Sequence, residues 1–535
     1  MRVQSVLALL LTASAALAKF QDDCASLSTS FARQDTEVLV AKYIPAGTNL
    51  TFDDTAGPGC WRFPVLAPVD MCRLRLSHAT SRSSSVAVEI FMPVDWMSKG
   101  RRLLMTGNGG LGGCIYYTDM AFAVKLGFAA VGHNNGHDGD TGEPFLNSPE
   151  VITDYTWRAL YKAGRLAKSA IKHFYSGNEV KRSYYMGCST GGRQGMKAAQ
   201  EFPSEYDGII SSCPALAAAG LAAMGSKFYF LVGPPGSPTH LTVKQWGRVH
   251  QMVIDQCDWI DGVLDGILED PRKCRPRPEA LLCRPGESWE SDQCLTIAQV
   301  NTVREFYQPM YGNGGKLLYP RWQPLTREGA GFRQGYGGVP SHWAEGWYAN
   351  ALHNDPEWTI PANWTLETVE KDLEDHYGLN TYNTDLSYQQ GNGTKVILIH
   401  GLTDGLVTSE ISYQYYDDVV RTMNLKSQEI DEFFRFFPIP GLDHCFNGEG
   451  AWYVGGPFQY YNTEAWMFDA SDSVIMTMVK WVEEGIAPET LTGRSFVDGA
   501  VVAEKHHCRY PYESKYKGSG DPNLASSWEC AGMQL

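Results

Sequence analysis

The chain has 535 residues, with 45 Lys or Arg against 60 Asp or Glu, so its formal net charge is −15. An acidic chain of this kind is a poor partner for nucleic acid and for anionic membranes, and we expect it to bind neither. Its length exceeds what one simple hydrophobic core supports, so we expect one large catalytic domain with a sizeable insertion.

The first 18 residues have the pattern of a secretory signal peptide. Arg2 supplies a basic start, residues 6–11 form an apolar core, and Ala16 and Ala18 mark a small-residue cleavage site. The apolar run is shorter than the roughly 20 residues that a membrane span needs. We therefore expect a secreted, extracellular protein whose mature chain begins near Lys19.

The rest of the chain has the alternating strands and helices of an α/β protein. Helices are predicted over residues 154–173 and 192–201. Strands are predicted over residues 86–91, 102–105, 128–131, 183–186, 396–399 and 433–437. Residues 218–388 contain few strand-like runs, and we interpret them as an inserted lid domain. Residues 19–217 and 389–535 would then form the catalytic domain.

A glycine-rich segment, residues 106–113, follows the second predicted strand and formally contains G-x-G-x-x-G. A dinucleotide site is not expected, because the chain is secreted and shows no clear βαβ unit. The alternatives are a flexible turn and an oxyanion-hole loop, whose backbone N–H groups face a developing alkoxide. We expect the oxyanion hole, with one donor from Gly109 or Gly110 and the other from Thr190.

Residues 187–191 match the motif G-x-S-x-G, with Ser189 at its centre. A predicted strand precedes the motif and a predicted helix follows it, which is the context of a nucleophile elbow. An ordinary turn serine is the alternative. The pattern predicts that Ser189 is a nucleophile, and a serine nucleophile requires a base and an orienting carboxylate.

Candidates for the acid and the base follow the last two predicted strands. Asp404 and His444 stand at strand ends, where such sheets place their sites. Asp443 is a rival acid, but as the direct neighbour of His444 it cannot easily reach the ring from the correct side. His400 is a rival base, and its place at a strand end favours a structural role. The predicted catalytic triad is Ser189, Asp404 and His444.

The most specific feature is the cysteine beside two of these residues. Cys188 directly precedes Ser189, and Cys445 directly follows His444. A serine and its base must approach to about 3 Å, which would bring the flanking cysteines within the roughly 4.4–6.8 Å Cα separation of a disulfide. We therefore predict a Cys188–Cys445 bond beside the catalytic pair.

Thirteen cysteines in a secreted chain predict disulfides and at least one residue left over. Short sequence separations indicate the local pairs Cys257–Cys274, Cys283–Cys294 and Cys508–Cys530. Four N-terminal cysteines allow three connectivities: Cys24, Cys60, Cys72 and Cys114. Cys213 remains, and its apolar surroundings predict a buried, inert thiol.

Residues 257–267, within the expected insertion, contain three aspartates interleaved with glycines. Calcium binds about six to eight oxygens, some of them from backbone carbonyls. The expected ligands are the carboxylates of Asp258, Asp261 and Asp265 and the carbonyls of Val263 and Ile267. The loop is no EF-hand, since the spacing of its first acidic residues differs from that motif. A solvated acidic turn is the alternative.

Three N-x-S/T sequons begin at Asn49, Asn363 and Asn392. In a secreted eukaryotic protein such asparagines carry glycans and mark the surface. We expect all three to be glycosylated.

With these residues assembled, the chain resembles the tannase and feruloyl esterase family of secreted fungal α/β-hydrolases. The paired Cys188-Ser189 and His444-Cys445 carry the likeness, together with the glycine loop and the aspartate loop. The resemblance implies an α/β-hydrolase fold with a large inserted lid domain, one structural calcium ion in the lid and no redox cofactor. It also implies the disulfides Cys24–Cys72 and Cys60–Cys114, and it provides no partner for Cys213.

The resemblance further implies a serine carboxylesterase that works through an acyl-enzyme. The expected substrates are feruloyl and p-coumaroyl esters of plant cell-wall polysaccharides such as xylan. The alternatives are a tannase, which cleaves galloyl esters of tannins, and a secreted binding protein that kept the fold without the chemistry.

Overall fold

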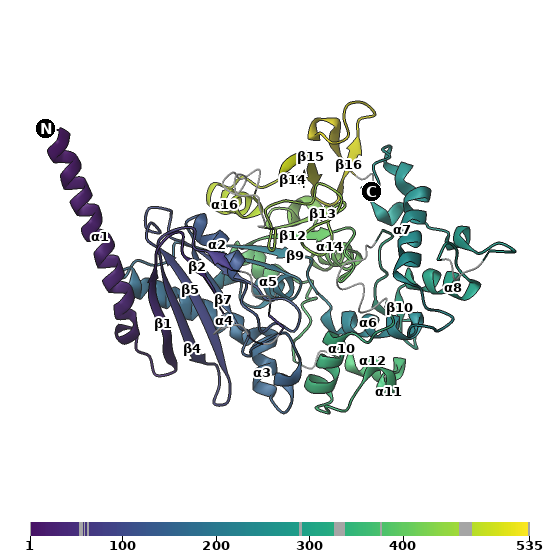
Figure 1. Ribbon diagram of the computed structural model, residues 1–535, viewed down its shortest axis with the longest axis horizontal. Coiled ribbons are helices and arrows are strands. Elements are labelled where there is room, and N and C mark those ends of the chain that lie inside the picture. The colour runs from purple at the N-terminus through teal and green to yellow at the C-terminus, as the bar shows by residue number, and fades with distance from the viewer. Residues whose placement is uncertain are drawn as a thin grey trace. The chain divides into compact units, whose positions relative to one another are not determined.

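Figure 1 shows a computed structural model of the chain. It describes residues 2–52, 57, 59–60, 64–287, 292–325, 337–374, 377–459 and 473–532, with the side chains of residues 2–13 excepted. The chain divides into two compact units. The first holds residues 1–140, 149–185 and 205–207, and the second holds residues 141–148, 186–204 and 208–535.

The first unit contains strands in the hydrogen-bonded order β1-β4-β5-β7-β6. Only β6 and β7 are parallel among these neighbours. The strands of this unit are β1 (Thr36–Ile44), β2 (Asn49–Leu50), β3 (Val65–Leu66), β4 (Met71–Ala79), β5 (Ser85–Pro93), β6 (Arg102–Thr106) and β7 (Ala129–His133). Its helices are α1 (Arg2–Ser30), α2 (Tyr117–Lys125), α3 (Pro149–Thr153) and α4 (Ala159–Phe174).

Helix α4 shows how a sequence pattern becomes packing. Leu160, Ala163, Ala167 and Ile171 recur at helical spacing and are buried, and the helix packs against β5 and β7. The predicted helix over 154–173 is thus confirmed, except that its first five residues form a π-helical turn, Asp154–Arg158.

The second unit contains the parallel strands β9 (Gly208–Ser212), β12 (Lys395–Gly401) and β13 (Phe434–Ile439), in that order. They are buried along nearly their whole length, which explains their continuous apolar sequence. In register, Ile399 pairs with Ser212 on one side and Phe437 on the other. The carboxyl ends of the three strands therefore meet at one edge.

Strand β8 (Arg182–Cys188) divides between the units, since Met186 to Cys188 belong to the second. The nine strands form one mixed sheet of order β1-β4-β5-β7-β6-β8-β9-β12-β13. The predicted α/β class is confirmed, and all six predicted strands coincide with β5, β6, β7, β8, β12 and β13 to within about two residues at either end.

The helices of the second unit begin with α5 (Thr190–Glu201), which packs against β9. Helix α16 packs against β9 and β12. The further helices are α6 (Ala218–Val232), α7 (Val243–Cys257), α8 (Ile297–Phe306), α10 (His342–Gly346), α11 (Ile360–Asn363), α12 (Leu366–Asp372), α13 (Ser387–Asn392), α14 (Glu410–Met423), α15 (Ser427–Ile430) and α16 (Val474–Glu484).

Residues 218–388 lie wholly within the second unit. Their described part consists of helices and one short hairpin, β10 (Met310–Tyr311) with β11 (Leu317–Tyr319), and adds no strand to the nine-stranded sheet. This composition is what an insertion between β9 and β12 would have. The bounds of a separate lid domain stay a prediction.

Two antiparallel hairpins near the C-terminus have no counterpart among the predicted strands. They are β14 (Thr490–Val497) with β15 (Ala500–Cys508), and β16 (Tyr512–Tyr516) with β17 (Trp528–Gly532). Lys505 of β15 contacts Glu269, just after the aspartate loop.

The predicted signal peptide coincides with the first part of α1, and its cleavage stays a prediction. The three sequon asparagines, Asn49, Asn363 and Asn392, are exposed. None of the helices in the described ranges has both the length and the apolar character that crossing a bilayer requires.

Candidate active site

Ser189 stands on a sharp turn between β8 and α5. Its backbone adopts φ 61° and ψ −119°, a left-handed conformation that costs a non-glycine residue energy. The turn is held from both sides, because Ser189 N donates to Ser212 O at 2.9 Å and Ser189 O accepts from Arg193 N at 2.9 Å. This strained strand–turn–helix geometry is that of a nucleophile elbow.

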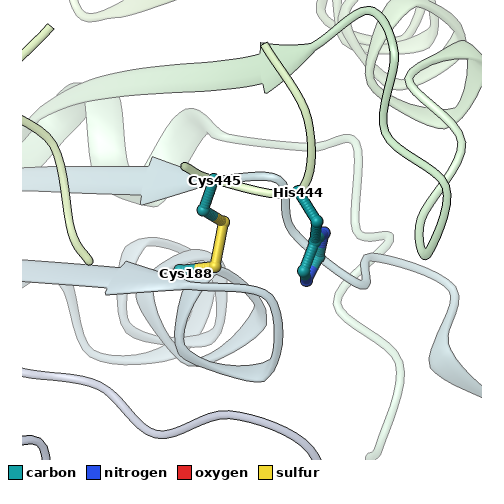
Figure 2. A group of neighbouring side chains, drawn as sticks. All are labelled: Cys188, His444 and Cys445. Atoms are coloured by element: carbon teal, nitrogen blue, oxygen red, sulfur yellow. A yellow bond between two sulfur atoms is a disulfide. The ribbon is translucent and has the colours of Figure 1, made fainter. Parts of the chain in front are cut away.

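The cysteines next to Ser189 and His444 are joined. Cys188 and Cys445 form a disulfide with a Cα–Cα separation of 6.1 Å, across 257 residues of sequence. Figure 2 shows this bond beside the imidazole of His444. A ring nitrogen of His444 and the two sulfurs lie within 4.8 Å of one another. The disulfide therefore ties the residue before Ser189 to the residue after His444.

Asp404 and His444 come together because the loops after β12 and β13 are in close contact. Thr403 N donates to Leu442 O at 3.1 Å, and a Cβ at Gly401 would lie only 2.3 Å from Leu442 O. Only glycine permits this approach. As a result, His444 Nδ1 lies 2.7 Å from Asp404 Oδ2.

Asp404 is 2% exposed, so its charge must be balanced by local donors. Leu406 N and Val407 N donate to Oδ1 at 2.8 and 2.9 Å. Burial alone would raise the pKa of Asp404, but the charge of His444 and the hydrogen bonds from His400 and His444 outweigh burial and lower it. The carboxylate is therefore ionised and can orient the His444 ring.

The rival residues occupy other positions. Asp443 accepts from the Thr403 hydroxyl at 2.8 Å. His400 is fully buried, with Nδ1 2.7 Å from Ser412 Oγ and Nε2 2.9 Å from Val407 O. His400 was expected to have a structural role, yet its Nε2 lies 3.3 Å from Asp404 Oδ2.

The glycine loop belongs to the first unit and is shaped by Asp140, a residue that no sequence pattern indicated. Its carboxylate Oδ1 accepts from Leu111 N at 2.7 Å and Gly112 N at 3.4 Å. A Cβ at Gly110 would lie 2.2 Å from that same oxygen, which explains the glycine there. Gly109 and Gly110 thus stand in a braced loop of the first unit and Thr190 in the second, and their shared oxyanion hole stays a prediction.

The aspartate loop is a tight turn after α7. Asp258 accepts from Gly266 N at 2.9 Å, and Asp261 accepts from Val263 N and Glu269 N, each at 3.1 Å. Asp265 accepts from Ile267 N at 3.1 Å. The three carboxylates are thereby gathered on one loop.

Negative charge is concentrated around this loop. Burial raises the pKa of Asp261 to about 6 against two backbone hydrogen bonds, and the charges of Glu269 and Asp265 act in the same direction as burial. Glu269 Oε2 is buried and makes no hydrogen bond to any described residue, while Lys505 Nζ lies 2.8 Å from Glu269 Oε1 and 3.5 Å from Asp265 Oδ2. An orphaned carboxylate oxygen among three aspartates fits a site for a hard cation, and the carbonyls of Val263 and Ile267 lie on the same loop.

The structure joins the other cysteines in the pairs expected from sequence and resemblance. These are Cys24–Cys72, Cys60–Cys114, Cys257–Cys274, Cys283–Cys294 and Cys508–Cys530. Cys213 has no disulfide partner and is fully buried against Cys188 and Cys445.

Comparison with known proteins gives consistent relatives. Residues 72–531 match the family described as "Tannase and feruloyl esterase". "Probable feruloyl esterase B" of Emericella nidulans is 42% identical over 517 residues, which cover 96% of this chain and 95% of the relative. The protein of that name from Aspergillus clavatus is 42% identical over 534 residues, which cover 98% of this chain and 99% of the relative.

Solved structures agree in fold. The crystal structure of feruloyl esterase B from Aspergillus oryzae is 39% identical with a TM-score of 0.91, and the match covers 96% of this chain and 100% of that one. The tannin acyl hydrolase from Aspergillus niger is 19% identical with a TM-score of 0.71, covering 96% of this chain and 94% of that one, which shows a shared fold only.

Proposed function

The chain belongs to the tannase and feruloyl esterase family of carboxylic ester hydrolases, and from that premise we propose that it hydrolyses hydroxycinnamoyl esters of plant cell-wall polysaccharides. Feruloyl and p-coumaroyl groups are the proposed acyl parts. One observation supports a hydrolytic mechanism most directly: His444 Nδ1 lies 2.7 Å from Asp404 Oδ2. The Cys188–Cys445 disulfide beside this contact joins the neighbours of Ser189 and His444.

In the proposed mechanism, Asp404 holds His444 with its Nδ1 hydrogen toward the carboxylate, which leaves Nε2 to act as the base. His444 takes the proton of Ser189 Oγ, and Oγ attacks the ester carbonyl. The resulting acyl-enzyme is hydrolysed by a water that His444 deprotonates, and the acid leaves. The strained elbow supports this role for Ser189 by presenting Oγ at the end of β8.

The proposed oxyanion hole combines Thr190 N–H, at the start of α5, with N–H donors from Gly109 or Gly110. The contacts of Asp140 support the glycine loop in this role. The amides of Leu111 and Gly112 donate to Asp140 Oδ1, and these hydrogen bonds fix the conformation of the loop. Such preorganised donors need no rearrangement as negative charge develops, and one of them typically lowers a barrier by about 2.7–4 kcal/mol.

We also propose that the fold is an α/β-hydrolase fold in which residues 218–388 form a lid. The serine on the β8–α5 turn and the acid and base after β12 and β13 follow the chain order of that fold. The helical composition of the described residues between 218 and 388 supports the lid.

A structural calcium ion is proposed for the aspartate loop. Asp258, Asp261 and Asp265 would supply carboxylate oxygens, and Val263 and Ile267 would supply backbone carbonyls. A divalent cation there would neutralise carboxylates that burial and mutual repulsion otherwise disfavour, and it would tie the loop together. It takes no part in the proposed reaction.

Secretion and glycosylation complete the proposal. The signal-peptide pattern of residues 1–18 and six disulfides support an extracellular protein. The exposure of Asn49, Asn363 and Asn392 supports glycans at these positions.

The test compares hydrolysis of methyl ferulate and methyl gallate by the wild type and by Ser189→Ala. We expect ferulate turnover that Ser189→Ala lowers by at least about 10⁴-fold, because the nucleophile is lost, with an unchanged melting temperature. A preference for gallate would reassign the enzyme as a tannase with the same triad. Full activity of Ser189→Ala would refute the mechanism. No Ser189-dependent turnover of either ester would favour a binding protein.

A further inference from the structure

The carboxylate of Asp404 receives hydrogen bonds at both of its oxygens. Two backbone amides, Leu406 N and Val407 N, occupy Oδ1 at 2.8 and 2.9 Å. Oδ2 faces two imidazoles, with His444 Nδ1 at 2.7 Å and His400 Nε2 at 3.3 Å. The oxygen that orients the proposed base is therefore shared with a second, fully buried histidine.

The ring of His400 has a defined orientation. Nε2 lies 2.9 Å from Val407 O, and a carbonyl only accepts, so Nε2 must carry a hydrogen. This nitrogen donates to Val407 O and also lies 3.3 Å from Asp404 Oδ2. Nδ1, on the opposite side of the ring, lies 2.7 Å from Ser412 Oγ. Both ring nitrogens are thus held, and the ring cannot turn without losing a partner.

The elements that carry these contacts are rigid. His400 is the penultimate residue of β12, in the middle of the parallel strands, and Ser412 belongs to the first turn of α14. Asp404 lies on the connection between that strand and that helix. The ring therefore bridges the two ends of the short loop that carries the acid.

Cys213 closes the remaining side of this cluster. Its sulfur, a ring nitrogen of His400 and a carboxylate oxygen of Asp404 lie within 4.8 Å of one another. Burial, and next to it the charge of Asp404, raises the pKa of the Cys213 thiol well above its ordinary value, so the thiol stays protonated and adds no negative charge. A thiol is only a weak donor, which leaves His400 as the strong donor on this side of the carboxylate.

We propose that His400 is a positioning residue of the hydrolytic site. Its Nε2–H holds Asp404 Oδ2 so that the carboxylate keeps one fixed direction toward His444 Nδ1. The inference rests on the proposed triad and adds a fourth side chain to it. His400 touches neither the substrate nor Ser189, and it acts only through Asp404.

The chemical consequence is a preorganised acid. Without His400, Oδ2 keeps a single strong side-chain partner, and the loop carrying Asp404 loses its bridge between β12 and α14. A displacement of about 1 Å in a catalytic group can lower a rate by roughly 100-fold. The loss should appear in kcat, because the acid contributes to proton transfer and not to substrate binding.

The test uses the full-length protein and four variants. His400→Leu removes the donor, and His400→Gln keeps an amide N–H near the position of Nε2. His507→Leu is the matched control, because His507 is also fully buried and donates to a carbonyl, Ala451 O at 2.8 Å, outside the site. Ser189→Ala reports whether the serine is the nucleophile at all. Each is assayed for kcat and KM on methyl ferulate, for its rate of labelling by a fluorophosphonate, and for its melting temperature.

We expect His400→Leu to lower kcat and the labelling rate by about 10- to 100-fold, with KM within about twofold of wild type. His400→Gln should recover most of that loss. His507→Leu should lose thermal stability with kcat unchanged. Equal activity of His400→Leu and wild type, or equal losses in His400→Leu and His400→Gln, would overturn the proposal.

Two safeguards keep the outcomes separate. If Ser189→Ala still hydrolyses ester and accepts the label, the proposed function fails and not the positioning role alone. If His400→Leu does not fold, Ser412→Ala replaces it, because it frees the ring at Nδ1 and leaves Nε2 in place. We then expect a drop in kcat of about 3- to 10-fold with KM unchanged, and an unchanged kcat would overturn the proposal.

Discussion

The second unit holds two polar clusters that are built in opposite ways. In the proposed catalytic cluster, His444 and Asp404 are 40 residues apart, and the adjoining disulfide spans 257 residues. In the aspartate loop, the backbone hydrogen bonds to Asp258, Asp261 and Asp265 come from groups two to eight residues away, and Lys505 Nζ adds one distant contact to Asp265 at 3.5 Å. The first cluster exists only when distant strands assemble, whereas the backbone contacts of the second lie within one short segment.

This difference predicts different failures. Damage to the catalytic cluster should stop the chemistry of a folded protein, since the surrounding strands are held by their own burial. Damage to the aspartate loop should lower stability and leave the chemistry intact while the protein is folded.

The largest effect is expected for Asp404→Asn. The amide presents a hydrogen where His444 Nδ1 needs an acceptor, which favours the wrong ring tautomer, so kcat should fall by about 10⁴-fold. Asp443→Asn is the control, because Asp443 accepts from Thr403 and its loss should change kcat by less than about tenfold. Steady-state kinetics at one pH gives kcat for both variants. Similar losses of kcat in the two would contradict the assignment of Asp404 as the acid.

Removing disulfides sharpens the comparison of long-range with local links. The chain-entropy rule gives about 5.5 kcal/mol for a closed loop of 257 residues and about 3 kcal/mol for one of 17 residues. Cys188→Ala with Cys445→Ala should therefore destabilise more than Cys257→Ala with Cys274→Ala, as measured by urea unfolding. Only the first pair should also lose activity below its unfolding transition. Equal activity in both double variants would show that the disulfide beside His444 does not support the site.

Calcium removal tests the local cluster. A ligand at 100 times its Kd stabilises a folded protein by about 2.7 kcal/mol, so chelation should lower the melting temperature measurably. Asp261→Asn should lower it without chelator and make it insensitive to calcium, with kcat unchanged at 25 °C. Asp255→Asn, which removes an exposed charge from nearby α7, is the control and should keep the response. If chelator leaves the melting temperature of the wild type unchanged, the result would argue against the calcium site.

Mild acid should affect the stability of the fold before it changes the charge of Asp404. The pKa of Asp404 is lowered, so this carboxylate stays charged in mild acid. Burial, helped by the charges of Lys505 and His506, lowers the pKa of His507 to about 4 despite its bond to Ala451 O. Because the unfolded chain takes up a proton at His507 near pH 6.5 and the folded protein does not, stability is lost as the pH falls from 6.5 toward 4.

The size of this effect can be measured with one variant. At pH 5, protonation of His507 in the unfolded chain should lower the free energy of unfolding by about 2 kcal/mol relative to neutral pH. Between pH 7 and pH 5, the free energy of unfolding should therefore fall by about 2 kcal/mol less in His507→Gln than in the wild type. Identical pH dependence of the two proteins would show that His507 does not control the acid sensitivity.

Much of the site was predictable because its residues carry local signals. Ser189 stands in a five-residue motif between a strand and a helix, and the three aspartates of the aspartate loop lie within one short segment. The contact of His444 with Asp404 was predictable only through the order of strands, since nothing adjacent in sequence joins them. The roles of His400 and Asp140 were missed, because a buried histidine at a strand end and an acidic residue in a loop have no distinguishing pattern of their own.

The sequence by itself determined the α/β class, the strands that become β8, β12 and β13, and the residue types at their ends, because apolar periodicity and turn motifs are local properties. The tertiary structure alone decided that Asp140 binds the amides of the glycine loop and that His400 lies beside the carboxylate that faces His444. Those choices depend on strand register and on the close approach of loops that are far apart in the chain, where a shift of one residue would turn each side chain to the opposite face.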